Sequence, residues 1–233
     1  MLSPAMPFDT RRIRALTFDC YGTLIDWDTG VRTALRTLTS LAGADLERVA
    51  REREEEEQAL LGGKYLSYTE ILVRSLRAAA ARQGRVPQHG ELVSFAHSMA
   101  HWPAFPDAAG ALRRLATGHA LAILSNVETK TLQSSIKILG APFAARITAD
   151  EIRSYKPAPA HWEEGLKRLH QTRESVLHVA GSLYHDVRPA RALGFATCWI
   201  NRRGEPAPAD LDDTLVFPGL AALADFLCGP TAA

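Results

Sequence analysis

The stretch of residues 13–26, I-R-A-L-T-F-D-C-Y-G-T-L-I-D, constrains this chain more than any other. A short apolar run that includes Leu16 and Phe18 stops at Asp19, and a Gly-Thr pair follows closely. This pattern predicts a buried strand that ends in a tight turn. Asp19 is then at the carboxyl end of a strand, where open α/β sheets bind ligands because the loops there diverge into a crevice.

A carboxylate in this place has two interpretations. Asp19 can cap the turn by accepting hydrogen bonds from backbone N–H groups, as many aspartates do. It can also be a nucleophile that forms an ester with the substrate and is later released by water. The residues that follow the other predicted strands help to decide between the two.

Further short apolar strands are predicted at 121–124, 145–148, 176–180, 197–200 and 215–217. Helical patterns separate most of them. An alternation of this kind is typical of a parallel sheet with helices on both faces, joined by right-handed crossovers. We therefore predict an α/β fold with a Rossmann-like parallel core.

Polar residues stand where three of these strands or their loops end. Ser125 and Asn126 close the second strand and offer a hydroxyl, an amide and free N–H groups to an anion, although an ordinary helix cap has the same composition. Lys156 precedes a proline in Y-K-P-A-P, where an isolated lysine is normally an exposed loop residue. Asp186 ends the segment G-S-L-Y-H-D after the fourth strand.

These segments occur in the order F-D-C-Y-G-T-L, L-S-N, Y-K-P-A-P and G-S-L-Y-H-D, which resembles the four motifs of the haloacid dehalogenase superfamily. The resemblance implies that Asp19 is the nucleophile, that Lys156 pairs with it, and that Asp186 is the acid of the fourth motif. An ammonium within about 4–6 Å of a partly buried carboxylate lowers its pKa and favours the ionised form that attacks.

Tyr21 favours one branch of that superfamily. Its phosphatases carry a second Asp two residues after the first, which protonates the departing alcohol. A halide leaves as a stable anion without a proton, so Tyr21 fits the 2-haloacid dehalogenase branch, although it can also simply pack beneath a cap. We include Cys20 among the residues expected around the substrate. Because successive side chains of a strand point to opposite faces, however, Cys20 points away from Asp19, which favours a packing role.

Residues 27–102 carry helical patterns and no strand. We predict that they form a helical cap domain inserted into a catalytic core made of residues 1–26 and 103–233. Such a lid excludes water from the crevice and favours charge-separating chemistry. Trp102, at the return to the core, and the cap residues Tyr65 and Tyr68 are candidates to set the size of the pocket.

The cap contains the run R-E-R-E-E-E-E at 51–57. One reading is a solvated helix face with pairs such as Arg53 and Glu57 four residues apart. The other turns an arginine inward to hold a substrate carboxylate, which a planar guanidinium suits. The resemblance implies such a cap arginine, and we choose Arg53 over Arg51.

Composition excludes several classes of partner. Lys and Arg total 27 against 26 for Asp and Glu, so there is no net field to recruit nucleic acid or a membrane surface. No apolar run approaches the roughly 18 residues of a membrane span. Three cysteines without metal-like spacing indicate reduced thiols and a cytoplasmic protein. A homodimer is left open.

The function we predict is hydrolytic dehalogenation of short 2-haloalkanoic acids without a metal or other cofactor. One alternative is a magnesium-dependent phosphatase with Asp19, the Tyr21 carbonyl and Asp186 as ligands. Another is a catalytically silent binding module. The fourth motif departs from both enzyme branches: Ser182 stands where phosphatases have a further acid, and Gly181 and Leu183 stand where dehalogenases have Ser and Asn. His185 is a candidate base, or else a packing residue.

Overall fold

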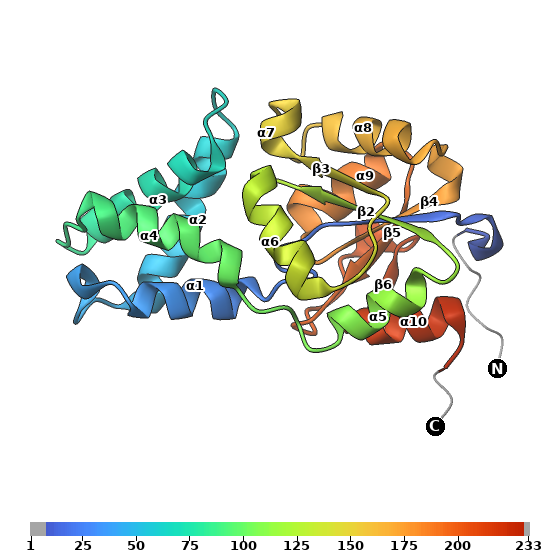
Figure 1. The fold of residues 1–233 in the computed structure, drawn as a ribbon, viewed down its shortest axis with the longest axis horizontal. Coiled ribbons are helices and arrows are strands. Elements are labelled where there is room, and N and C mark those ends of the chain that lie inside the picture. The colour runs from blue at the N-terminus through green and yellow to red at the C-terminus, as the bar shows by residue number, and fades with distance from the viewer. Residues whose placement is uncertain (1–7, 231–233) are drawn as a thin grey trace.

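The computed structural model describes residues 8–230. Its core is a six-stranded sheet in the order β3-β2-β1-β4-β5-β6, in which every neighbouring pair runs parallel. The strands are β1 (Ala15–Phe18), β2 (Ala120–Ser125), β3 (Ala145–Thr148), β4 (Val176–Ala180), β5 (Ala196–Ile200) and β6 (Leu215–Phe217). The predicted α/β fold with a Rossmann-like sheet is confirmed (Figure 1).

Helices cover both faces of the sheet. On one face lie α5 (Ala108–Leu115), α6 (Thr129–Leu139) and α10 (Leu220–Cys228), and on the other lie α8 (Ala160–Leu169) and α9 (Arg188–Ala192), with the short α7 (Ala149–Ile152) after β3. Successive residues of a strand point to opposite faces, so Leu16 and Phe18 of β1 join the first layer while Ala15 joins the second. Burial on both sides explains why the central strands are continuous apolar runs.

Four helices lie beside the sheet rather than on it (Figure 1). They are α1 (Trp27–Arg36), α2 (Leu46–Leu61), α3 (Tyr68–Arg82) and α4 (His89–Ser98), and we call them the cap. Polar side chains cap the N-termini of α1, α2 and α3. Asp26, Asp45 and Ser67 each accept a hydrogen bond from a backbone N–H in the first turn. These three helices therefore have well-defined starts, and buried apolar residues of the cap join the same cluster as one face of the sheet.

The two segments that connect the cap to the sheet run side by side. The Asp26 N–H donates to the Pro103 carbonyl (2.8 Å), and the Phe105 N–H donates to the Leu24 carbonyl (2.9 Å). The chain thus leaves the core and returns to it at one place, directly after the turn that holds Asp19.

Shorter helical turns complete the described chain. They are the 3-10 helices Thr10–Arg12, Thr39–Leu41, Met99–His101, Arg173–Ser175 and Ala209–Leu211, and the π-helix Leu183–Val187. None of the helices within residues 8–230 combines the length and the apolar character that crossing a membrane requires.

Candidate active site

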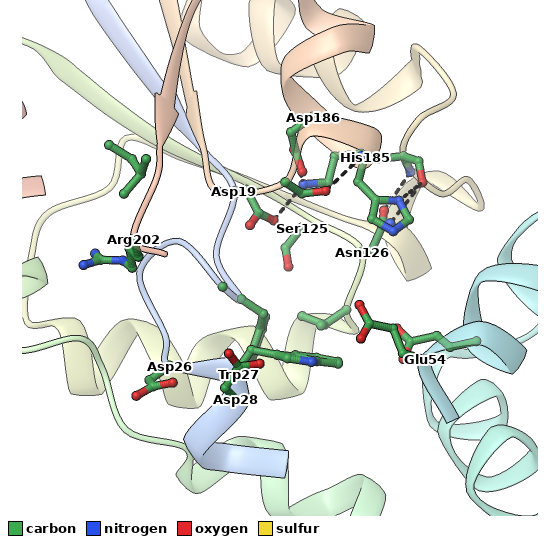
Figure 2. A pocket seen from close by; sticks show the side chains of 18 of the residues that line it. Asp19, Asp26, Trp27, Asp28, Glu54, Ser125, Asn126, His185, Asp186 and Arg202 are labelled. Carbon is green, nitrogen blue, oxygen red and sulfur yellow. Dashed lines mark hydrogen bonds and ion pairs between the residues drawn. The ribbon is translucent and has the colours of Figure 1, made fainter. Parts of the chain in front are cut away.

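The candidate site lies where the strand order reverses. From β1 the chain adds β2 and β3 on one side and then returns to place β4 on the other, so the carboxyl ends of β1, β2 and β4 are neighbours. This is the position at which doubly wound sheets open into a binding crevice. A cavity of about 450 Å³ is found there, and Asp19, Ser125 and Asp186 line it (Figure 2).

Lys156 connects the carboxylates of the site. Its Nζ donates to Asp19 Oδ1 (2.8 Å), to Asp186 Oδ1 (2.5 Å) and to the Leu124 carbonyl (2.9 Å). The side chain is 1% exposed. An ammonium has three N–H donors, and here each has an acceptor. The structure therefore brings together Asp19, Lys156 and Asp186, which lie far apart in the sequence.

The two carboxyl groups differ in their proton affinity. Burial alone would raise the pKa of Asp186, but the Lys156 ammonium and a hydrogen bond from His178 lower that pKa to about 2. For Asp19 burial has the larger effect and raises the pKa, and Lys156 opposes only part of the rise. The sequence-based expectation that Lys156 lowers the pKa of Asp19 is therefore correct for the interaction itself and wrong for the net shift.

Two polar residues that we did not single out from the sequence support this network. Thr23 donates its hydroxyl to Asp19 Oδ2 (2.7 Å) and accepts from the Gly181 N–H (2.8 Å), so both Asp19 oxygens are held. His178 on β4 bonds Asp186 Oδ1 through Nε2 (3.1 Å) and the Thr17 hydroxyl through Nδ1 (2.9 Å). The short spacing of Thr23 from Asp19 was a usable signal, whereas His178 is hidden in an apolar strand pattern.

Ser125 and Asn126 both line the cavity but serve it differently. Ser125 is buried, and its carbonyl accepts a hydrogen bond from His161 Nε2 (3.0 Å). The Asn126 side chain pairs with the Lys156 backbone: its Nδ2 donates to the carbonyl (3.1 Å), and its Oδ1 accepts from the N–H (2.7 Å). Asn126 thus positions the Lys156 backbone, and its expected contact with the substrate remains a prediction.

Tyr21 lines the cavity, but its hydroxyl is engaged elsewhere. It hydrogen-bonds the Ser135 hydroxyl of α6 (2.8 Å), and its ring meets the rings of Trp27 and Trp102 edge to face. Burial raises the pKa of Tyr21 strongly, so the phenol stays protonated. Trp102 is buried in this aromatic group and does not line the cavity, contrary to the expectation that it sets the pocket size.

Two further residues that we expected to contact the substrate, Cys20 and Arg53, are buried and do not line the cavity. Cys20 is fully buried in the core, and the cavity lining does not include it, which agrees with the packing role. Arg53 is 1% exposed inside the cap, where its guanidinium pairs with Glu57 and lies over the rings of Trp27 and Phe95. The structure does not bring Arg53 to the cavity, because its partner and the aromatic rings hold it within the cap.

The remaining wall comes from the cap and from the loop after β5. Cap residues in the lining are Trp27, Asp28, Glu54, Glu57, Gln58, Leu61 and Tyr68. Tyr68 donates its hydroxyl to Glu57 Oε1 (2.5 Å), which fixes both groups. At the other end, Arg203 of the loop pairs with Asp28 of α1 (2.7 Å) and links core to cap. The cavity is therefore enclosed from two sides (Figure 2).

The donor set for a metal ion is poor in the part of the chain that the structure describes. Within residues 8–230, no three His, Cys, Asp or Glu side chains gather in a way that could hold a metal. Asp19 and Asp186 are the two carboxylates that meet at the site, and both share the Lys156 ammonium. A cation of the protein thus already occupies the place between them.

The comparisons with known proteins agree with this architecture. A family model described as haloacid dehalogenase-like hydrolase matches residues 13–194. Haloacetate dehalogenase H-2 of Moraxella sp. (strain B) is 32% identical over 199 residues, which cover 83% of this chain and 88% of that protein. The (S)-2-haloacid dehalogenase 1 of Pseudomonas sp. (strain CBS-3) is also 32% identical, with coverages of 83% and 87%.

A solved structure described as a dehalogenase with an intermediate complex is 25% identical, with a TM-score of 0.82 over 93% of this chain and 98% of that one. The likeness therefore extends over the sheet and the cap together. This chain belongs to the haloacid dehalogenase-like hydrolases.

Proposed function

We propose that this protein is a hydrolytic dehalogenase of short 2-haloalkanoic acids, and that Asp19 is its nucleophile. The observation that carries the proposal is the shared Lys156 ammonium, which holds Asp19 at the end of β1 in a cavity lined by both core and cap residues. Two relatives that are 32% identical over most of the chain bear the names of a haloacetate dehalogenase and an (S)-2-haloacid dehalogenase.

In the first step an Asp19 oxygen attacks C2 of the substrate, a carbon–oxygen bond forms, and the halide leaves with the bonding electrons. Lys156 and Thr23 fix the carboxylate in place, so little orientation entropy is lost at the moment of attack. The Ser125 hydroxyl and the N–H groups that follow β2 hold the substrate carboxylate. Attack from behind inverts C2, so an (S)-haloacid should give the (R)-hydroxy acid.

In the second step water attacks the carboxyl carbon of the Asp19 ester and not C2. The carbon–oxygen bond between Asp19 and the product breaks, and the free carboxylate returns to Lys156. Asp186 keeps its charge through this step because its pKa is about 2, so it balances the ammonium when Asp19 is esterified. The inversion at C2 is retained in the product.

The reaction proceeds without a divalent metal. A metal-dependent phosphatase uses its cation to neutralise a phosphate, whereas a haloacid brings one carboxylate that N–H and hydroxyl donors can hold. Lys156 supplies the positive charge between Asp19 and Asp186. Tyr21 stands where an acid would protonate an alkoxide leaving group, and its hydroxyl is bonded to Ser135.

A substrate screen tests this function. Release of halide from fluoro-, chloro- and bromoacetate and from both enantiomers of 2-chloropropionate is measured against phosphate release from p-nitrophenyl phosphate, each with and without EDTA. We expect halide release that EDTA leaves intact, a preference for the (S) enantiomer, and little phosphate release. Phosphate release that requires magnesium, with no halide release, would favour the phosphatase alternative.

A further inference from the structure

His185 lies on a widened turn at the end of β4, next to Asp186. The π-helix Leu183–Val187 contains an i to i+5 bond, from the Val187 N–H to the Ser182 carbonyl (3.1 Å). Single π-turns are rare and are frequent at functional sites. The His185 N–H is held by the Ser182 hydroxyl (3.0 Å). Through this turn two successive side chains, His185 and Asp186, both reach Lys156.

The hydrogen bond of the His185 ring defines its tautomer. Nδ1 lies 3.3 Å from the Lys156 carbonyl oxygen. A carbonyl oxygen can only accept, so Nδ1 must carry the proton. In the neutral ring the other nitrogen, Nε2, then has an unshared electron pair. The bond to Lys156 thus orients the imidazole as a base whose basic atom is Nε2.

Nε2 is accessible and unengaged in the described part of the chain. No residue within 8–230 hydrogen-bonds it, and it is not among the buried polar atoms that lack a partner, so space that water can reach adjoins it. His185 lines the same cavity as Asp19 and Ser125 (Figure 2). His185 therefore lines the chamber in which the ester must be hydrolysed, and its ring carries an unengaged proton acceptor.

The other acidic groups of the lining are poorly suited to accept a proton from water. Asp186 Oδ1 accepts from both Lys156 and His178, and its pKa of about 2 makes the carboxylate a weak base. Glu57 is bonded to Arg53 and Tyr68. The remaining carboxylates of the lining have other partners or other places. Asp28 and Glu205 pair with Arg203, Asp26 accepts from the Thr29 N–H, and Glu54 is on the cap side of the cavity.

We propose that His185 is the general base of the hydrolytic step, an inference that rests on the proposed dehalogenase function. Nε2 takes a proton from water as the water oxygen bonds to the Asp19 carboxyl carbon. The tetrahedral intermediate expels the product alkoxide, which takes that proton from the imidazolium and becomes the 2-hydroxy acid. Asp19 is left as a carboxylic acid and returns to carboxylate by losing one proton to solvent, which balances the overall release of halide and H⁺.

Pre-steady-state kinetics of His185→Gln tests this inference. Because His185 acts only on hydrolysis, the variant should release one halide per active site in a burst about as fast as the wild type. Its steady-state rate should then fall by about 10²-fold or more, the usual contribution of a general base. Mass spectrometry of the quenched protein should find the Asp19 peptide esterified. His97→Gln, an exposed histidine of α4, is the matched control and should behave as wild type.

The outcomes separate the two proposals. A His185 that merely supports the Lys156 loop would slow the burst and the steady state together, and that result overturns the base assignment while the dehalogenase function stands. An unchanged steady-state rate overturns it as well. If the wild-type protein releases no halide from any haloacid, the dehalogenase function fails and the assignment of His185 fails with it.

Discussion

The two walls of the cavity differ in the elements that form them and in how their charges are paired. The core wall, formed by Asp19, Ser125, Lys156 and Asp186, takes each polar group from a different strand end or loop of the sheet. The cap wall comes from the starts of α1 and α3 and from α2, and its residues are Trp27, Asp28, Glu54, Glu57, Gln58, Leu61 and Tyr68. The core wall shares one buried cation between two carboxylates, whereas in the cap the Arg53 charge is balanced by Glu57.

This difference assigns the chemistry to the core wall. A rigid sheet fixes Asp19 against its neighbours, and a low-dielectric interior makes the Lys156 charge effective there. The cap contributes side chains to the cavity wall, and its buried Arg53–Glu57 ion pair lies within the cap itself. The predictions below test this division by removing groups from each wall.

The largest effect is expected for Asp19→Asn in the core wall. An amide has nearly the shape of the carboxylate but is a poor nucleophile, so halide release should fall by roughly 10³-fold or more. Lys156 keeps its bond to Asp186, so thermal unfolding followed by circular dichroism should show a folded protein. Near wild-type halide release by this variant would remove Asp19 from the chemistry.

Lys156→Met should affect both activity and stability. Two carboxylates would be left buried without their shared cation, which typically costs about 3–5 kcal/mol of unfolding free energy. Halide release should drop by about 10²-fold or more, because the carboxylate loses its position and its charge partner. Urea unfolding at neutral pH and a halide assay measure the two losses. Lys167→Met removes a lysine that is 79% exposed and serves as the control.

The pH dependence of halide release should report the raised pKa of Asp19. Only the ionised carboxylate attacks, and its pKa in the folded protein lies above the ordinary value of 3.8. Activity should therefore be lost, tenfold per pH unit, as the pH falls through a value above 3.8. Thr23→Val removes a hydrogen bond that lowers this pKa, so the acid limb of kcat/KM should move to higher pH. If the acid limb of kcat/KM does not move in this variant, the Thr23 hydrogen bond does not lower the pKa of Asp19.

The smallest effect on activity is expected in the cap. Arg53→Met alone leaves Glu57 buried without its partner and should cost about 3–5 kcal/mol of unfolding free energy. The double variant Arg53→Met, Glu57→Gln removes both charges and should recover much of that loss, with KM for the haloacid within about threefold of wild type. A KM increase of more than tenfold in the double variant would show that Arg53 binds the substrate carboxylate.

Most residues of the core wall could be identified from the sequence, because each is marked by the few residues next to it in the chain. A strand that ends in a polar residue can be recognised from a few neighbours, and parallel strands bring their ends together at one edge, so Asp19, Ser125 and Asp186 could be placed in advance. The alternation of short apolar strands with helical patterns was likewise enough to predict the parallel sheet, and the structure confirms its six strands.

The cap wall was harder to predict for physical reasons. The run at 51–57 has the composition of a solvated helix face, and only the packing of α2 within the cap decides that Arg53 points inward to Trp27 of α1 and Phe95 of α4. The same limit applies to His178, because an isolated histidine in an apolar strand does not reveal that it will bond Asp186. Such partners depend on contacts between distant segments.

A single turnover in water enriched in oxygen-18 tests the central claim most directly. Enzyme in excess over haloacid is quenched after one turnover, and the hydroxy acid and the peptide that contains Asp19 are analysed by mass spectrometry. If Asp19 forms the ester, the product carries unlabelled oxygen and the label appears in the Asp19 carboxylate. Label in the product on that first turnover would mean that water attacks C2 directly, and it would contradict the assignment of Asp19 as the nucleophile.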